Sequence, residues 1–280
     1  MKIKFTKMHG LGNDYIYINC FKYKLDGVDL TNLAIKMSDR HFGVGSDGLV
    51  LIMPSKIADA KMKIFNPDGS EAQMCGNAIR CVSRYLYEAG IAQKERLSVE
   101  TEGGIKTIEL ALENQTFSAK VNMGEPILDA KQIPTNFSKE KVIDELIYAD
   151  GKEIHATCVS MGNPHCIAFV DDVNFEGFGR IGKALENHKM FPERINAELV
   201  KIIDKSHIQM RVWERGAGET LACGTGACAS VVACVLNGKT ERDVTVQLKG
   251  GGLNIEWRKE DNCVYMEGPA EFVFRGGWNL

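Results

Sequence analysis

The sequence predicts an α+β protein of two pseudo-symmetric lobes, each a mostly antiparallel, curled sheet around a central buried helix. Two observations predict this: the chain repeats itself at a nearly constant offset, and each repeat combines short β-rich runs with one clear helix. The predicted N-terminal lobe covers residues 1–126, and the predicted C-terminal lobe covers residues 127–280. The very end of the chain could pack back on the N-terminal lobe.

The repeat is visible in segments that occur in the same order in both halves. At the offset that separates Cys75 from Cys223, KMKIFNPDG (61–69) falls on QMRVWERGA (209–217). Four more pairs lie at nearly the same offset: LGNDYIYI (11–18) with MGNPHCIA (161–168), LVLI (49–52) with LVKI (199–202), LSVETEGG (97–104) with VTVQLKGG (244–251), and VNMGEP (121–126) with VYMEGP (264–269). A shared order at a nearly constant offset indicates an internal duplication.

Short β-rich runs broken by Gly, Pro and Asn predict the strands of the first lobe. These runs are residues 2–10, 15–20, 48–54, 60–66, 97–102, 106–112 and 117–123. One helix is predicted after each Cys-Gly. In the first, apolar residues recur at helical spacing until Gly90 ends the pattern. The second, residues 227–236, is apolar on nearly every side, which is typical of a buried helix. A weaker helix is predicted at 178–189.

Composition and charge exclude several classes of protein. The chain has 280 residues, 44% of them hydrophobic and 25% charged, as in ordinary globular proteins. A net charge of −3 gives no electrostatic reason to expect nucleic acid or a membrane surface as partner. The longest apolar stretch is too short to span a bilayer, and the N-terminal residues lack the apolar region of a signal peptide. Nine cysteines without an export signal predict reduced thiols and a cytoplasmic location.

Two cysteines at helix starts predict a specific chemistry. A helix N-terminus lowers the pKa of a thiol and also binds carboxylates, and the glycine after each cysteine allows close approach of a ligand. Two lobes facing each other would place Cys75 and Cys223 on opposite sides of one cleft, which would be the active site. A thiolate and a thiol could then remove a proton from one face of a carbon and return one to the other. The residues alone therefore predict a two-base racemase or epimerase.

Other interpretations of the same residues remain open. A non-enzymatic amino-acid-binding protein could use the same helix starts to hold a carboxylate, and a racemase of related architecture could act on another amino acid. Metal ligation is not expected, because the cysteines lack the short spacings of zinc sites. GVGSDG (43–48) lacks the context of a nucleotide-binding loop. Retention of both cysteines favours an enzyme over a binding module, since binding needs only backbone N–H groups.

Five motifs resemble those of the diaminopimelate epimerase family, over essentially the full length. They are MHGLGNDYIYI, NPDGSEAQMCGNAIRC, GNPHCIAF, ERINAE and ERGAGETLACGTGACAS. The resemblance implies cofactor-independent interconversion of LL- and meso-diaminopimelate, in the synthesis of lysine and peptidoglycan precursors. It implies no pyridoxal phosphate and no metal, and a small amino-dicarboxylate as substrate. It implies neither a nucleic-acid nor a membrane partner, and it leaves the oligomeric state open, with a homodimer as the candidate.

The resemblance also implies roles for individual residues. Cys75 and Cys223 match the catalytic thiols, whose donor and acceptor roles exchange with the direction of reaction. Positions that match substrate contacts are Asn13, Asn66, Gly76, Asn77, Asn163, Asn196, Glu214, Arg215, Gly224 and Thr225. Among these, backbone N–H groups after each cysteine hold the α-carboxylate, and Arg215 is the natural fork for the distal carboxylate. His165 and Glu214 match positions that tune the pKa values of the thiols. One departure is Gly48, where many relatives have glutamine.

Overall fold

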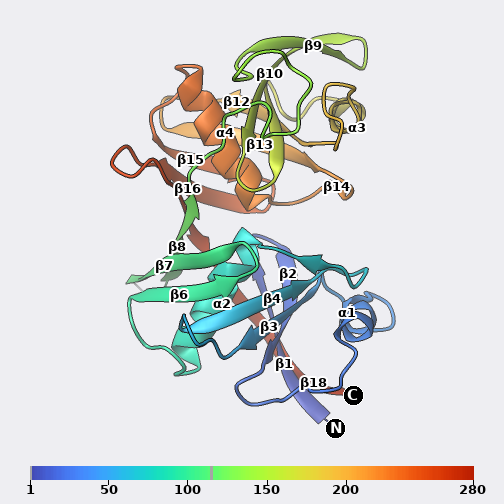
Figure 1. Ribbon diagram of the computed structural model, residues 1–280, viewed down its shortest axis with the longest axis vertical. Helices are drawn as coiled ribbons and strands as arrows, with labels where there is room; N and C mark the ends of the chain where they lie inside the picture. Colours follow the sequence, from blue (N-terminus) through green and yellow to red (C-terminus); the bar gives the residue numbers. More distant parts are fainter. Residues whose placement is uncertain (1, 114–115) are drawn as a thin grey trace. The chain divides into compact units, whose positions relative to one another are not determined.

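The computed structural model describes residues 2–113 and 116–280, and the chain divides into two compact units (Figure 1). The first unit is Met1–Val121 with Glu267–Leu280, and the second is Asn122–Met266. The division therefore falls at residue 121, compared with the expected residue 126. The C-terminal residues belong to the first unit because β18 (Glu271–Asn279) pairs with β1 (Lys2–Gly10).

The first unit is a mixed sheet in which most neighbouring strands are antiparallel. Antiparallel pairs are β18–β1, β1–β2, β3–β4, β6–β7 and β7–β8, and parallel pairs are β2–β3 and β4–β6. The short β5 adds to β4. The remaining bounds are β2 (Asn13–Asn19), β3 (Leu49–Met53), β4 (Ala60–Phe65), β5 (Glu71–Ala72), β6 (Arg96–Thr101), β7 (Gly104–Glu113) and β8 (Thr116–Gly124). All seven predicted strands of this lobe are present.

The second unit follows the same scheme. Antiparallel pairs are β9–β10, β10–β11, β12–β13 and β15–β16, parallel pairs are β11–β12 and β13–β15, and β14 adds to β13. The bounds are β9 (Glu145–Ala149), β10 (Lys152–Ser160), β11 (Pro164–Phe169), β12 (Asn196–Ile202), β13 (His207–Glu214), β14 (Gly218–Glu219), β15 (Asp243–Leu248), β16 (Gly251–Trp257) and β17 (Val264–Pro269). The same order of pairings in both units confirms the duplication.

Strand register gives residue equivalences that the sequence match alone leaves loose. Tyr17 on β2 lies opposite Val50 on β3, and Ile167 on β11 lies opposite Glu198 on β12. Tyr17 and Ile167 are equivalent in the repeat, so Val50 and Glu198 occupy equivalent places. The pairing of LVLI (49–52) with LVKI (199–202), which would set Val50 on Val200, is therefore wrong by two residues. One unit therefore has an apolar side chain where the other has a carboxylate.

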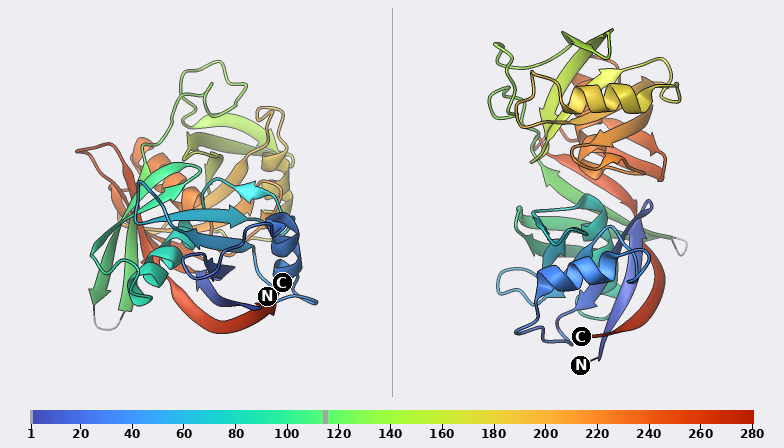
Figure 2. Two further views of the ribbon diagram at one scale, coloured as in Figure 1. Left: turned by 60° about the horizontal axis from the view of Figure 1, so that its bottom comes forward. Right: turned by 90° about the vertical axis from the view of Figure 1, so that its right-hand side faces the viewer.

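Each unit encloses one long helix and carries a second one outside it. α2 (Gly76–Glu88) packs on β1, β2 and β7, while α4 (Gly224–Leu236) packs on β10, β11, β12, β15 and β16. From Gly226 to Cys234 every residue of α4 is buried, as its apolar sequence predicts. The outer helices are α1 (Leu30–Ser38), which was not predicted, and α3 (Phe178–Glu186), which ends earlier than expected (Figure 2). Asp29 caps α1 by accepting from Asn32 N–H.

Candidate active site

Cys75 occupies the N-cap position of α2. Its backbone is extended (φ −140°, ψ 120°), and its carbonyl accepts the first helical hydrogen bond from Ile79 at 3.0 Å. The thiol donates to Asn13 Oδ1 at 3.5 Å. The sulfur therefore lies where the first turn leaves backbone N–H groups without helical partners. Gly76 and Asn77, the expected carboxylate-binding positions of this unit, form that first turn.

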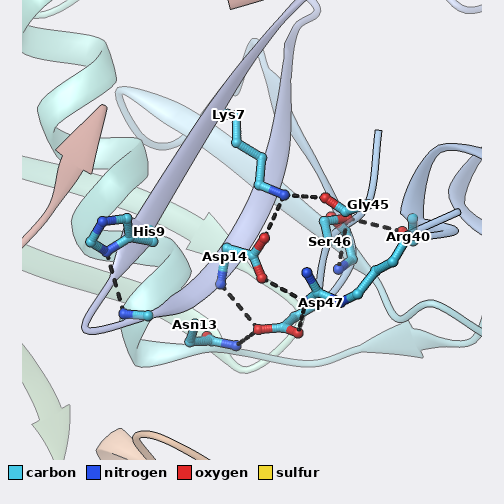
Figure 3. Close-up of polar contacts among 11 residues, drawn as sticks. Lys7, His9, Asn13, Asp14, Arg40, Gly45, Ser46 and Asp47 are labelled. Carbon is cyan, nitrogen blue, oxygen red and sulfur yellow. Dashed lines mark hydrogen bonds and ion pairs between the residues drawn. The ribbon is translucent and has the colours of Figure 1, made fainter. Parts of the chain in front are cut away.

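The side-chain amide of Asn13 is held in one orientation (Figure 3). Its Oδ1 accepts from Asn77 Nδ2 at 3.1 Å as well as from the thiol, and its Nδ2 donates to Asp47 Oδ2 at 2.8 Å. Arg40 donates to the other oxygen of Asp47 at 2.8 Å. Because Asp47 occupies the amino end, the amide presents its oxygen to Cys75. Asp47 and Arg40 were not among the predicted site residues, although Asp47 lies in the GVGSDG segment.

Burial raises the pKa of the Cys75 thiol, and several neighbours oppose this rise. The N–H groups of Ala78 and Asn77 and the hydroxyl of Tyr15 stabilise the thiolate, as does the charge of Arg80. The helix start therefore acts in the expected direction, but burial outweighs it, so the pKa stays above its ordinary value. The sequence-based expectation of a lowered pKa treated the helix end alone and omitted desolvation.

Arg80 places a fully buried positive charge beside the start of α2. Its guanidinium donates to Asn77 Oδ1 at 2.8 Å and to the carbonyls of Gly76 and Pro269 at 3.1 Å each. It was not singled out from the sequence, although an arginine on the buried side of a helix is an informative signal.

The predicted position Asn66, and Gly48 where the sequence departs from the family motif, have different surroundings. Asn66 lies in the turn after β4, where its amide donates to Ser70 Oγ at 3.0 Å. Gly48 has φ +152°, and a Cβ there would collide with the carbonyl of Phe65 and lie 2.9 Å from Tyr15 Cε1. A side chain at position 48 would therefore be strained in this backbone.

Cys223 occupies the equivalent N-cap position of α4. Its backbone is again extended (φ −118°, ψ 109°), and its carbonyl accepts from Ala227 at 3.0 Å. The sulfur lies 3.5 Å from Thr225 Oγ1 and also accepts from the backbone N–H of Gly226. The predicted carboxylate-binding residues Gly224 and Thr225 form the first turn here too.

Two carboxyl groups lie near Cys223. Burial raises the pKa of this thiol far above its usual range, and the charges of Glu214 and Glu198 raise it further. Glu214 accepts from Thr220 Oγ1, and burial followed by the charge of Glu198 raises its own pKa. The two thiols thus differ, because Cys75 has a positive charge nearby and Cys223 has negative ones.

His165 and Glu198 form a pair that is wholly buried, with 0% exposure for both side chains. His165 Nδ1 lies 2.7 Å from Glu198 Oε1, and Nε2 lies 3.0 Å from Asn163 Oδ1. Within the described part of the chain, Glu198 Oε2 has no hydrogen-bond partner. The structure thus brings the predicted residues Asn163 and His165 together. Glu198 was missed, although it ends the ERINAE motif.

The loop after β13 carries Arg215 and is fastened by two side chains. Asn196 donates to the carbonyl of Pro164 at 2.8 Å and accepts from the backbone N–H of Arg215 at 3.0 Å, so both ends of its amide hold main chain. Glu186, at the end of α3, accepts from Gly216 N–H at 2.8 Å and was not predicted. The Arg215 side chain is exposed and donates to the carbonyl of Glu193 at 3.2 Å.

Among residues 2–113 and 116–280, no group of three or more His, Cys, Asp or Glu side chains could hold a metal ion. All nine cysteines are free thiols. No helix of the described chain is long and apolar enough to cross a membrane.

Comparison with known proteins identifies the family. A model of the family "Diaminopimelate epimerase" matches residues 5–128 and 157–273. The chain is 57% identical over 279 residues to a diaminopimelate epimerase from Acetivibrio thermocellus, with 99% of each chain covered. It is 54% identical over 275 residues to one from Methanococcus maripaludis, covering 98% of this chain and 99% of the relative. The chain belongs to the diaminopimelate epimerase family. The resemblance inferred from the five motifs is thus confirmed.

Solved structures outside the diaminopimelate epimerase family share the fold. A phenazine biosynthesis protein of the PhzF family from Bacillus anthracis superposes with a TM-score of 0.72 at 18% identity, and covers 100% of both chains. A hydroxyproline epimerase from Agrobacterium vitis gives a TM-score of 0.69 at 14% identity, covering 99% of this chain and 91% of that one. The predicted α+β fold is confirmed by these neighbours.

Proposed function

We propose that this protein interconverts LL- and meso-diaminopimelate, and that Cys75 and Cys223 act on opposite faces of the reacting α-carbon. One observation carries the proposal: the two units of the duplicated fold each cap a buried helix with a free cysteine, at equivalent positions. A duplicated binding site would need the N–H groups of both helix starts but no thiol. Membership of the diaminopimelate epimerase family supports the choice of substrate.

The proposed reaction is a pair of proton transfers at one carbon. The thiolate of one cysteine removes the α-proton, and the thiol of the other delivers its proton to the opposite face, so one thiolate and one thiol remain. The carboxylate of the substrate carries the negative charge that develops in between. The proposal assigns the stabilisation of that charge to the N–H groups at Gly76–Asn77 and Gly224–Thr225, since helix N-termini favour anions.

The distal half of the substrate is proposed to select diaminopimelate. The exposed guanidinium of Arg215 can bind its carboxylate through two donors, and the buried Glu214 can accept from an ammonium group. The proposal also places the protein in the cytoplasm, as a homodimer candidate, without nucleic-acid or membrane partners. The net charge of −3 supports this last part.

Single cysteine replacements test the proposal. Cys75→Ala and Cys223→Ala are each expected to abolish epimerisation of purified LL-diaminopimelate, followed by chiral separation without added cofactor. Cys228→Ala is the matched control, because this thiol lies buried within α4, and it is expected to remain active. More than a tenth of wild-type turnover in either single variant would contradict the two-base assignment.

Hydrogen isotope incorporation separates the proposal from its alternatives. In D₂O, early product is expected to carry deuterium at the reacting carbon and remaining substrate almost none, because a thiol holds a single exchangeable proton. Extensive early retention of protium in product would indicate a single base. Turnover of another amino acid only would indicate a racemase of related architecture, and binding without any exchange would indicate a binding protein.

A further inference from the structure

Glu198 is a buried carboxylate that the proposed reaction does not use. Its side chain is 0% exposed, one oxygen lies 2.7 Å from His165 Nδ1, and the other has no partner among the described residues. Its charge raises the pKa values of Glu214, Cys223 and Cys166. A buried charge is costly unless paired, so this carboxylate needs a reason to be there.

The contacts of His165 give that reason. Each ring nitrogen faces an oxygen, namely Glu198 Oε1 and Asn163 Oδ1. An ionised carboxylate and an amide oxygen only accept hydrogen bonds, so with Glu198 ionised both contacts are made when the ring is protonated on both nitrogens. A doubly protonated ring is a cation, and the carboxylate of Glu198 is the counter-charge that makes it tolerable in a buried position.

The orientation of Asn163 follows from this pair. Because its oxygen accepts from the imidazolium, its amino group is directed away from the ring, and Asn163 is partly exposed. Its repeat equivalent Asn13 is held the other way round, since Asp47 takes its amino end and leaves the oxygen for Cys75. Two equivalent amides thus present opposite ends: an acceptor in the first unit and a donor in the second.

We propose that Glu198 is a positioning residue, which holds His165 as an imidazolium and thereby fixes the amino group of Asn163 as a donor to the substrate carboxylate. The role is specific to the second unit, because the equivalent of Glu198 in the first unit is the apolar Val50. The kinetic part of this inference rests on the proposed function, whereas the protonation of His165 can be observed without turnover.

Two replacements separate charge, hydrogen bonding and shape. Glu198→Gln keeps an oxygen that accepts from Nδ1–H but removes the counter-charge. Glu198→Val removes both and introduces the residue that the fold already accommodates at position 50. Asp204→Asn is the matched control, because Asp204 pairs with His207 at 3.0 Å in the same unit but both side chains are 54% exposed.

The ring nitrogens are read by ¹⁵N-histidine NMR of the full chain, with the resonances of His165 identified by their loss in His165→Gln. Protons on both nitrogens are expected in the wild type and in Asp204→Asn. Glu198→Gln keeps the acceptor of Nδ1–H, so loss of the Nε2 proton is expected there, whereas Glu198→Val leaves only the acceptor of Nε2–H, so loss of the Nδ1 proton is expected. A wild-type ring that lacks either proton would overturn the proposal, whether or not the variants fold.

Kinetics supply the second readout. We expect kcat/KM to fall about 10- to 100-fold in Glu198→Gln, with a large part of the loss in KM, because the ring then keeps its proton on Nδ1 and Asn163 loses the donor that orients its amide. The loss should be smaller in Glu198→Val, where Nε2–H still donates to Asn163 Oδ1. Unchanged KM in Glu198→Gln, or equal losses in the two variants, would overturn the role in positioning. Absence of turnover in the wild type would instead contradict the proposed function and leave the NMR result to decide about Glu198.

Discussion

Replacing Gly226 with alanine tests how tightly Glu198 is packed against the start of α4. Alanine normally stabilises a helix by about 1 kcal/mol relative to glycine, and the equivalent position of α2 is already an alanine, Ala78. A Cβ at Gly226, however, would lie 2.5 Å from Glu198 Oε1 and 3.3 Å from the Cβ of Cys223. The glutamate oxygen in question is the one that lies 2.7 Å from His165, so it cannot move without weakening that pair.

The expected energies follow from these contacts. Weakening a hydrogen bond between charged groups costs about 1.5–3 kcal/mol, which exceeds the gain in helix propensity, so Gly226→Ala should destabilise the protein by about 0.5–2 kcal/mol. In a Glu198→Val background the collision is absent, and the same change should stabilise by about 1 kcal/mol. The two sites should therefore be coupled by about 1.5–3 kcal/mol, well above the deviation expected of independent sites.

Urea unfolding followed by circular dichroism measures all four members of this cycle. Ala78→Gly, at the equivalent place in the first unit, is the reference and should destabilise by about 1 kcal/mol. If Gly226→Ala stabilised the wild type as much as it stabilises the Glu198→Val background, the close approach of Glu198 to α4 would be refuted.

Three further predictions concern other contacts. Asp47→Asn keeps the shape but places an amino group opposite a donor, so the Asn13 amide should lose its orientation and kcat/KM should fall about tenfold or more in steady-state assays; an unchanged value would contradict the role assigned to Asp47. The carboxylate of Glu186 accepts from Trp213 Nε1 and from Gly216 N–H, so Glu186→Gln leaves one of these donors unpaired and should lower the free energy of unfolding in urea by about 1–3 kcal/mol. KM should also rise, because Gly216 follows Arg215 in the chain. Stability equal to that of the wild type would contradict this role of Glu186. Burial raises the pKa of Cys81 from 9.0 to about 12, so its contribution to stability is complete below pH 9 and is lost as the pH rises from 9 to 12. The free energy of unfolding of Cys81→Ala should therefore fall less steeply with pH over this interval than that of the wild type, and the two slopes should differ by up to about 1.4 kcal/mol per pH unit. Parallel plots of unfolding free energy against pH for the two proteins would refute the shift.

Local pattern was sufficient for the secondary structure and for the duplication. Strands of alternating or β-branched residues, and a helix after each Cys-Gly, follow from periodicity that is written along the chain. The missed helix α1 is short and amphipathic, and its only strong local signal was the cap at Asp29. The early end of α3 at Glu186 reflects packing, because that carboxylate turns to the loop after β13 and the helix stops there.

The sequence by itself determined the two helix-capping thiols, the residues that flank them and the family, because these depend on residue type at positions close together in the chain. Only the tertiary structure decided which charge lies beside each thiol. The sequence does not show that the charge of Arg80 lies beside Cys75 or that the charge of Glu198 lies beside Cys223. The effect of each charge on the thiol depends on burial, because burial weakens solvent screening and so strengthens the interaction with a nearby charge. The orientations of Asn13 and Asn163 were decided by contacts as well, since the two ends of an amide look alike until a partner is present. The loop before β3 brings Asp47 to the amino group of Asn13, and His165 on β11 faces the oxygen of Asn163.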